Sequence, residues 1–318
     1  MKIQNLFFRK WMGLSLVTLV LLAGCGGGGG EGSTSSNTSP EASRSGVISG
    51  TATKGPVSGA TVTAFSMNTN GTKGAQIGSA QTDGEGNFSI PVGNHSGPVM
   101  LQMSGGSYMD EATGSNMNMF TGDIMTCAIP AMSGSTINGV QITPLTSMAQ
   151  SWAQHMTVGM TSENITRVNQ AVGQYFNISD ILMIHPMDPT VNGSGASATG
   201  DMRSYGMSIA AMSQYARNIG MSYSSGMVTA MMNDATDGNM DGMMRDQSGM
   251  GSGMMGSTQV EMGGGMMGGT MMPADAGTRG LADAMAQFIN SPMNRSGLTA
   301  QDMQTLINKL ATSNGQIQ

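Results

Sequence analysis

The pattern of hydrophobic and polar positions divides the chain after residue 46 into two parts of different periodicity. In the first part, short segments rich in β-branched residues alternate apolar with polar positions and are separated by Gly, Pro and Asp. Such alternation, with turn signals at intervals of about 8–12 residues, is typical of an all-β sandwich. We therefore expect a β-sandwich over residues 47–140.

The clearest turn signal in this part is the run TDGEGNF at residues 82–88. Asp83 and the glycines that follow it favour a tight turn, and Phe88 and Ile90 then alternate with polar residues. The pattern predicts a β-hairpin that places the side chains of Phe88 and Ile90 in the core.

From Thr143 onward the apolar positions follow a helical period. Thr143 is a suitable N-cap and Pro144 suits the first helical position, where its missing N–H group would have no partner. Thr299 is a second expected cap. The predicted helices cover residues 144–156, 162–176, 200–219, 224–233, 280–289 and 300–311. The expected fold class is α+β in two domains, the second being an α-helical domain over 141–318 with a disordered Met/Gly-rich insertion at 238–276.

The first 24 residues contain the only long apolar stretch of the sequence. Lys2, Arg9 and Lys10 precede an apolar core at residues 11–22, and small residues follow it. This order is that of a secretory signal peptide. A membrane-spanning helix needs about 20 apolar residues, and the core is shorter than that. Residues 1–24 are therefore predicted to be removed on export.

The run LLAGC at residues 21–25 resembles the lipobox of bacterial lipoproteins. The resemblance implies that Cys25 is acylated and becomes the first residue of the mature chain, which its acyl chains hold to the membrane. Gly26, rather than Asp, follows the cysteine, and by analogy with lipoprotein sorting in enteric bacteria this favours the outer membrane. Gly and Ser predominate in residues 25–46, as is typical of a flexible tether.

Two motifs in the strand-rich part resemble the carboxypeptidase-regulatory-like (prealbumin-like) domain. They are PVSGATVTAF at residues 56–65 and TDGEGNFSI at residues 82–90. The resemblance implies seven strands, with Gly59 and Ala60 opening the second, and a structural or binding role without catalytic residues. The order of the later segments is similar to that of exported lipoproteins of deltaproteobacteria.

The net charge and the cysteine content limit the classes of partner and of chemistry that we expect. The formal net charge is −6, and removing residues 1–24 would leave 10 basic against 19 acidic residues. Such a chain lacks the basic surface that nucleic-acid binding requires and is not attracted to anionic lipid, so the acyl chains on Cys25 are the expected membrane contact. With Cys25 acylated, Cys127 is the only thiol, and its apolar neighbours predict a buried, unreactive side chain.

The Met/Gly-rich insertion holds the most unusual composition. Of 36 methionines in the chain, 11 fall between residues 240 and 272, and the segment 250–258 recurs in similar form at 262–270. Thioether sulfur is a soft ligand that suits Cu(I) or Ag(I), and the insertion is similar to Met-rich segments of periplasmic copper-handling proteins. The candidate ligands are Met250, Met254, Met255, Met262, Met266 and Met267. Two alternatives stay open: an inert loop that arose by repeat slippage, which the low complexity favours, and an oxidant sink through sulfoxide formation.

Residues 237–242, DGNMDG, match the opening of an EF-hand-type calcium loop, in which oxygen ligands at alternate positions converge on the ion. The candidate ligands are Asp237, Asn239 and Asp241. The closing position of such a loop falls on Ser248 rather than Glu. An ordinary Asp/Gly-rich surface turn is therefore the alternative interpretation.

Residues suited to catalysis are scattered. His95, His155 and His185 stand in three separate contexts, and the sequence contains no HExxH, Walker or GxSxG motif. Two GxGxxG matches, at 251–256 and 263–268, follow no strand and lie in no βαβ unit, so we do not expect a dinucleotide site there. Asp110 and Glu111 are expected to form a solvated turn at the domain junction. We therefore expect a non-catalytic, lipid-anchored binding or scaffold protein with a partner in the cell envelope. The alternatives are a Cu(I)/Ag(I)-binding protein and, last, an extracytoplasmic hydrolase.

Overall fold

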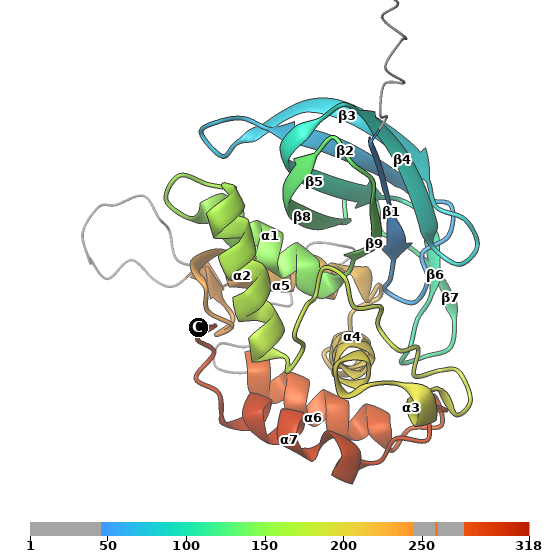
Figure 1. Ribbon diagram of the computed structural model, residues 1–318. Coiled ribbons are helices and arrows are strands. Elements are labelled where there is room, and N and C mark those ends of the chain that lie inside the picture. Colours follow the sequence, from blue (N-terminus) through green and yellow to red (C-terminus); the bar gives the residue numbers. More distant parts are fainter. Residues whose placement is uncertain (1–45, 245–257, 260–276, 318) are drawn as a thin grey trace, which may run out of the picture. The chain divides into compact units, whose positions relative to one another are not determined.

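The computed structural model describes residues 46–244, 258–259 and 277–317, and most of its strands precede its helices (Figure 1). The α+β prediction is confirmed. The predicted signal peptide, the tether up to residue 45 with Cys25, and the six candidate methionine ligands at 250–267 lie outside the described residues.

Two larger sheets are built from the strands between residues 46 and 142. One is three-stranded, in the order β4-β1-β9, and the other is four-stranded, in the order β3-β2-β5-β8, while β6 and β7 form a separate ribbon. The strands are β1 (Gly46–Ala52), β2 (Thr61–Met67), β3 (Lys73–Gln81), β4 (Asn87–Gly93), β5 (Ser96–Ser104), β6 (Ser107–Met109), β7 (Asn116–Asn118), β8 (Ile124–Ser133) and β9 (Ile137–Ile142).

The central strand of the three-stranded sheet is β1, which pairs antiparallel with β4 and parallel with β9. Along β4, Phe88, Ile90 and Val92 are buried and the residues between them are exposed. Successive side chains of a strand point to opposite faces, so β4 presents one apolar face to the core. The predicted inward positions of Phe88 and Ile90 are confirmed.

The prediction of a hairpin at residues 82–88 is wrong, although the turn is present. The Asp83 carboxylate accepts hydrogen bonds from the N–H groups of Glu85 and Asn87, at 3.0 and 2.8 Å. However, β3 pairs with β2 and β4 pairs with β1, so this turn connects the two sheets. Local residues specify the reversal of the chain, whereas distant strands decide which partner each strand finds.

The helices follow β9. Those predicted from residues 144, 162, 200 and 300 begin at these residues, whereas the one predicted from 224 begins at Ser225 and the one predicted from 280 begins at Gly277. Thr143 caps the first helix, because its Oγ1 accepts from the N–H of Thr146 while its own N–H donates to the Thr146 hydroxyl. Thr299 caps the last helix, and its N–H donates to Asp302. The helices are α1 (Pro144–His155), α2 (Ser162–Tyr175), α3 (Ser194–Ser197), α4 (Gly200–Asn218), α5 (Ser225–Asp234), α6 (Gly277–Ile289) and α7 (Ala300–Thr312). The short α3 was not expected. A 3₁₀ turn at Ala235–Asp237 and a small ribbon of β10 (Met243–Met244) and β11 (Thr258–Gln259) complete the elements.

Strands and helices pack directly on one another within residues 42–318, which form one compact unit. The apolar core of the helices includes Met100 and Ala128 of the four-stranded sheet, and the core of the sheets includes Leu182 and Val228 from the helical part. The division into two domains near residue 140 therefore stays a prediction. Within the described residues, none of the helices combines the length and the apolar character needed to cross a membrane.

Candidate functional site

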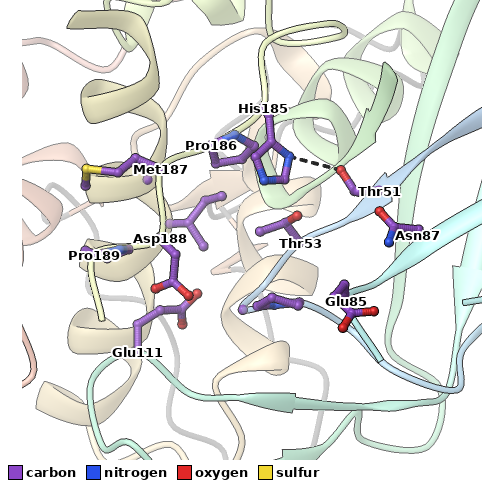
Figure 2. A pocket seen from close by; sticks show the side chains of 14 residues that line it. Thr51, Thr53, Glu85, Asn87, Glu111, His185, Pro186, Met187, Asp188 and Pro189 are labelled. Carbon is purple, nitrogen blue, oxygen red and sulfur yellow. Dashed lines mark hydrogen bonds between the residues drawn. The ribbon is translucent and has the colours of Figure 1, made fainter. Parts of the chain in front are cut away.

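A pocket of about 210 Å³ opens where the three-stranded sheet meets helix α4 and the segment 185–189 (Figure 2). Strands β1 and β4 contribute Thr51 and Asn87, and the turn between the sheets contributes Glu85. The remaining polar lining residues are Thr53, Glu111, His185 and Asp188. Residues far apart in the sequence thus converge on one cavity.

The wall opposite the sheet is the segment 185–189, HPMDP. It lies close to α4 because Gly206 has no side chain: a Cβ atom there would lie 1.8 Å from the carbonyl oxygen of Met187. The N–H of Met187 also donates to the carbonyl of Met202 at 3.1 Å. The prolines and this close approach fix the wall against the helix.

His185 lines the pocket, and its Nδ1 atom lies 3.2 Å from Thr51 Oγ1 (Figure 2). The same atom lies 3.2 Å from Gln141 Oε1. An amide oxygen can only accept, so we assign the ring proton to Nδ1, which leaves the lone pair on Nε2. Burial lowers the pKa of His185, against the opposing effect of Asp188. The ring is therefore neutral at pH 7.

Asp188 is held in place by its own turn. Its Oδ1 atom accepts from the N–H and the hydroxyl group of Thr190, at 2.8 and 2.7 Å. The carboxylate is partly exposed and lines the pocket. Its orientation is therefore set before any ligand arrives.

Beneath the pocket lies a group of buried charged residues, Lys54, Asp110 and Glu111, here called the Lys54 cluster. The prediction that Asp110 and Glu111 form a solvated turn is wrong, because their exposed fractions are 1% and 3% and that of Lys54 is 0%. The Lys54 ammonium lies 3.0 Å from Glu111 Oε2 and 4.0 Å from Asp110 Oδ2. This ion pairing makes burial of the two carboxylates tolerable.

Hydroxyl groups from the helices complete the Lys54 cluster. Ser213 of α4 contacts the Lys54 ammonium and donates to Glu111 Oε2. Ser224, just before α5, donates to Asp110, which also accepts from the N–H and hydroxyl groups of Thr113 at 2.9 Å. The cluster therefore joins the end of β1 and the turn after β6 to both helices.

The charges in the Lys54 cluster stabilise one another. Burial alone would lower the pKa of Lys54, but Glu111 and Asp110 outweigh it and raise that pKa above its ordinary value. Burial alone would raise the pKa of Asp110, but Lys54 and the hydroxyl donors lower it. A protonated ammonium has no lone pair, so Lys54 cannot take a proton from Ser213 as the base of a Ser–Lys hydrolase would.

The other histidines lie away from the pocket. The Nδ1 atom of His155 is 2.7 Å from the carbonyl oxygen of Ser151 at the end of α1, and the Nε2 atom of His95 is 3.3 Å from the carbonyl of Pro98. The expectation that Cys127 is buried is confirmed, and burial raises the pKa of its thiol far above the ordinary value. Such a thiol is unreactive.

The candidate calcium ligands lie in the 3₁₀ turn after α5 and in the residues that follow it. Asp237 Oδ1 accepts from the N–H and the side-chain amide of Asn239, at 2.9 and 3.1 Å. Asn239 forms a β-bridge with Gln316 near the C-terminus. Across the described ranges, no three residues among His, Cys, Asp and Glu are arranged to hold a metal ion. Calcium binding at Asp237, Asn239 and Asp241 stays a prediction.

Sequence reasoning did not find the pocket or the Lys54 cluster. A signal for the cluster exists, because Lys54 is the only charged residue between positions 46 and 72. A lone lysine among apolar strands, together with an isolated Asp-Glu pair some 57 positions further on, is the pattern of a buried ion pair. Nothing local to HPMDP indicates that it borders a cavity.

A second, more open hollow continues the pocket along the sheet. It shares Thr51, Asn87 and His185 with the first and extends to Gly139 and Met183.

No protein-family model matches this chain, and no curated protein matches it either.

Proposed function

We propose that this chain is a lipid-anchored protein of the bacterial cell envelope, with the outer membrane as its destination, and that its folded body is a non-catalytic binding module. The observation that carries the binding role is the pocket between β1, β4 and the segment 185–189, in which hydrogen bonds to other residues already hold the side chains of Thr51, His185 and Asp188. A preformed pocket binds with little loss of conformational entropy.

The sheets support the resemblance to a carboxypeptidase-regulatory-like domain. The three- and four-stranded sheets together hold seven strands, the number that the resemblance implies. Modules of that family act as structural or binding appendages, which agrees with a binding role here. In this proposal the helices that follow form the second part of the module and supply one wall of the pocket.

The anchoring part of the proposal is supported by the lipobox-like run that ends at Cys25 and by the Gly/Ser-rich segment after it. A flexible chain of 21 residues has a root-mean-square reach of roughly 25 Å. That distance would let the binding module stand clear of the bilayer and meet a partner in the envelope.

The proposal is tested by expressing the full chain in a Gram-negative host and separating the membrane fractions. We expect incorporation of labelled palmitate and recovery in the outer membrane, with both lost in a Cys25→Ser variant. Cys127→Ser is the matched control, since the buried thiol should make no difference. Equal labelling of the Cys25→Ser variant would contradict the anchor.

The binding role is tested on the same lipoprotein after detergent extraction. We expect small-molecule ligands that raise its unfolding temperature to lose this effect in a Thr53→Trp variant, in which a large ring fills the pocket. Thr61→Trp, at an exposed position of β2 outside the pocket, should keep the effect. A thermal shift that survives Thr53→Trp would place binding elsewhere.

A further inference from the structure

We infer that the pocket selects a small organic cation, a primary ammonium group on a short apolar chain, and that the ammonium group binds at Glu111. This inference rests on the proposed binding function and gives the chemical class of the ligand. Four features carry it: the charge around the cavity, the balance of buried charge, an open oxygen atom of Glu111, and the apolar frame.

The charged side chains around the pocket are of one sign. Glu85, Glu111 and Asp188 are among its lining residues, and neither Lys nor Arg is. His185 is neutral at pH 7, as its lowered pKa requires. A charged ligand that enters this cavity is therefore attracted if it is a cation and repelled if it is an anion.

The buried charges below the pocket do not balance. Lys54 supplies one positive charge, whereas Asp110 and Glu111 supply two negative charges, all at an exposed fraction of 3% or less. The nearby Arg217 directs its guanidinium group to the carbonyl oxygen of Ala112, at 3.0 Å. An excess buried negative charge is costly, so a cation placed next to it would be stabilised.

One oxygen atom of Glu111 is open toward the cavity. Both hydrogen bonds that the described residues make to this carboxylate, from Lys54 and from Ser213, go to Oε2. Oε1 receives none from them, although the side chain is only 4% exposed and borders the pocket. Figure 2 shows the carboxylates of Glu111 and Asp188 directed toward the same part of the pocket. A carboxylate oxygen that borders a cavity and receives no hydrogen bond from the described residues is a position that a ligand N–H group would fill.

Most of the remaining lining residues are apolar or glycine. Pro56, Pro186, Met187 and Ile209 frame the cavity. Its volume of about 210 Å³ is below the roughly 300–1,000 Å³ of pockets for drug-sized ligands. A short alkylammonium ion matches both the charge at Glu111 and this frame. A free amine and the side chain of a lysine both present such an alkylammonium group, so the pocket fits either one.

The test is a titration of the detergent-extracted full-length lipoprotein by calorimetry at pH 7. The probes are n-pentylammonium, pentanol and pentanoate, which share a chain length and differ in charge. We expect pentylammonium to bind and pentanol and pentanoate to bind at least about tenfold more weakly, as the loss of a charge-assisted hydrogen bond implies. A further titration with Nα-acetyl-lysine amide distinguishes a lysine side chain from a free amine. A titration with Ca²⁺ distinguishes a metal ion from an organic cation.

Two variants locate the ammonium group. Glu111→Gln removes the open carboxylate and leaves Lys54 balanced by Asp110, so the fold should persist, which circular dichroism checks. We expect it to weaken pentylammonium binding about tenfold or more. Asp188→Asn keeps an oxygen atom that can accept from Thr190, and it should weaken pentylammonium binding less than Glu111→Gln does. Glu163→Gln, at an exposed position of α2, should leave it unchanged.

The outcomes separate the inference from the proposed function. Binding of pentanol as tightly as pentylammonium would overturn the cation inference and leave a pocket for neutral ligands. A preference for Ca²⁺, or full pentylammonium affinity in Glu111→Gln, would also overturn it. Absence of binding by every probe, together with no ligand-induced thermal shift, would overturn both the inference and the binding role.

Discussion

Lys54 holds together three segments that meet only in the folded protein: the end of β1, the turn after β6 and helix α4. Replacing Lys54 with Met would leave Asp110 and Glu111 buried without a counter-charge. We expect the free energy of unfolding to fall by about 3–5 kcal/mol, the usual effect of breaking a buried ion pair. Urea unfolding followed by circular dichroism measures it.

Lys73→Met is the matched control, because Lys73 is exposed on β3, where its ammonium group lies 4.6 Å from the Phe65 ring and forms no ion pair within the described residues. Its loss should change the unfolding free energy by no more than about 1 kcal/mol. Adding Glu111→Gln and Asp110→Asn to Lys54→Met should recover part of the lost stability. Equal effects of Lys54→Met and Lys73→Met would show that the buried ion pairs do not hold the three segments.

Asp110 makes the free energy of unfolding depend on pH in the acidic range. Its pKa is lowered in the folded protein, so its contribution is fully present above the unfolded value of about 3.9 and is lost as pH falls through the folded value. We expect the difference in urea midpoint between the wild type and Asp110→Asn to be constant from pH 7 to about pH 5 and to shrink below about pH 4. Asp283→Asn, an exposed carboxylate of α6, should leave the acid limb unchanged. A difference that stays constant down to pH 2 would contradict this account.

At the scale of elements, the closeness of α4 to the segment 185–189 depends on one glycine. Gly206→Ala would place a Cβ atom 1.8 Å from the carbonyl oxygen of Met187, so the segment must move and the pocket must change shape. We expect a loss of about 1–3 kcal/mol in unfolding free energy, as for overpacked cores, despite the better helix propensity of Ala. Thermal and urea unfolding measure this loss.

Gly200 provides the control within the same helix. A Cβ atom at Gly200 meets nothing within 4 Å, so Gly200→Ala should be neutral or stabilising by up to about 1 kcal/mol. A Gly206→Ala variant as stable as Gly200→Ala would mean that the wall of the pocket yields without cost.

Elements whose signals are local could be predicted from the sequence, and those that depend on distant partners could not. The caps at Thr143 and Thr299 are decided by residues three positions away, and both were predicted. The turn at Asp83 was also predicted, but its role between two sheets depends on the pairing of β1 with β4 and of β2 with β3. Asp110 and Glu111 were misjudged because their partners Lys54 and Ser213 lie 57 and 102 positions from Glu111.

At the scale of the whole molecule, the first residues of the Met/Gly-rich insertion are hydrogen-bonded to residues near the C-terminus. The N–H of Met240 donates to the carbonyl of Gly315 at 2.7 Å, and that of Ile317 donates to Gly238 at 2.9 Å. Met240 itself is buried. The copper and calcium hypotheses therefore concern a segment whose beginning is bound to the last residues of the chain. A variant that removes the candidate sulfur ligands should start after Met244 so that this pairing stays intact.

The place of β1 in its sheet has a mechanical consequence. If Cys25 is held in a membrane, any tension on the protein enters the folded body at Gly46, the first residue of β1. Because β1 is hydrogen-bonded to β4 on one edge and to β9 on the other, pulling it out breaks two ladders at once. An edge strand at the same position would be peeled away from a single neighbour. Under load, the sheet would therefore open only when both ladders broke together.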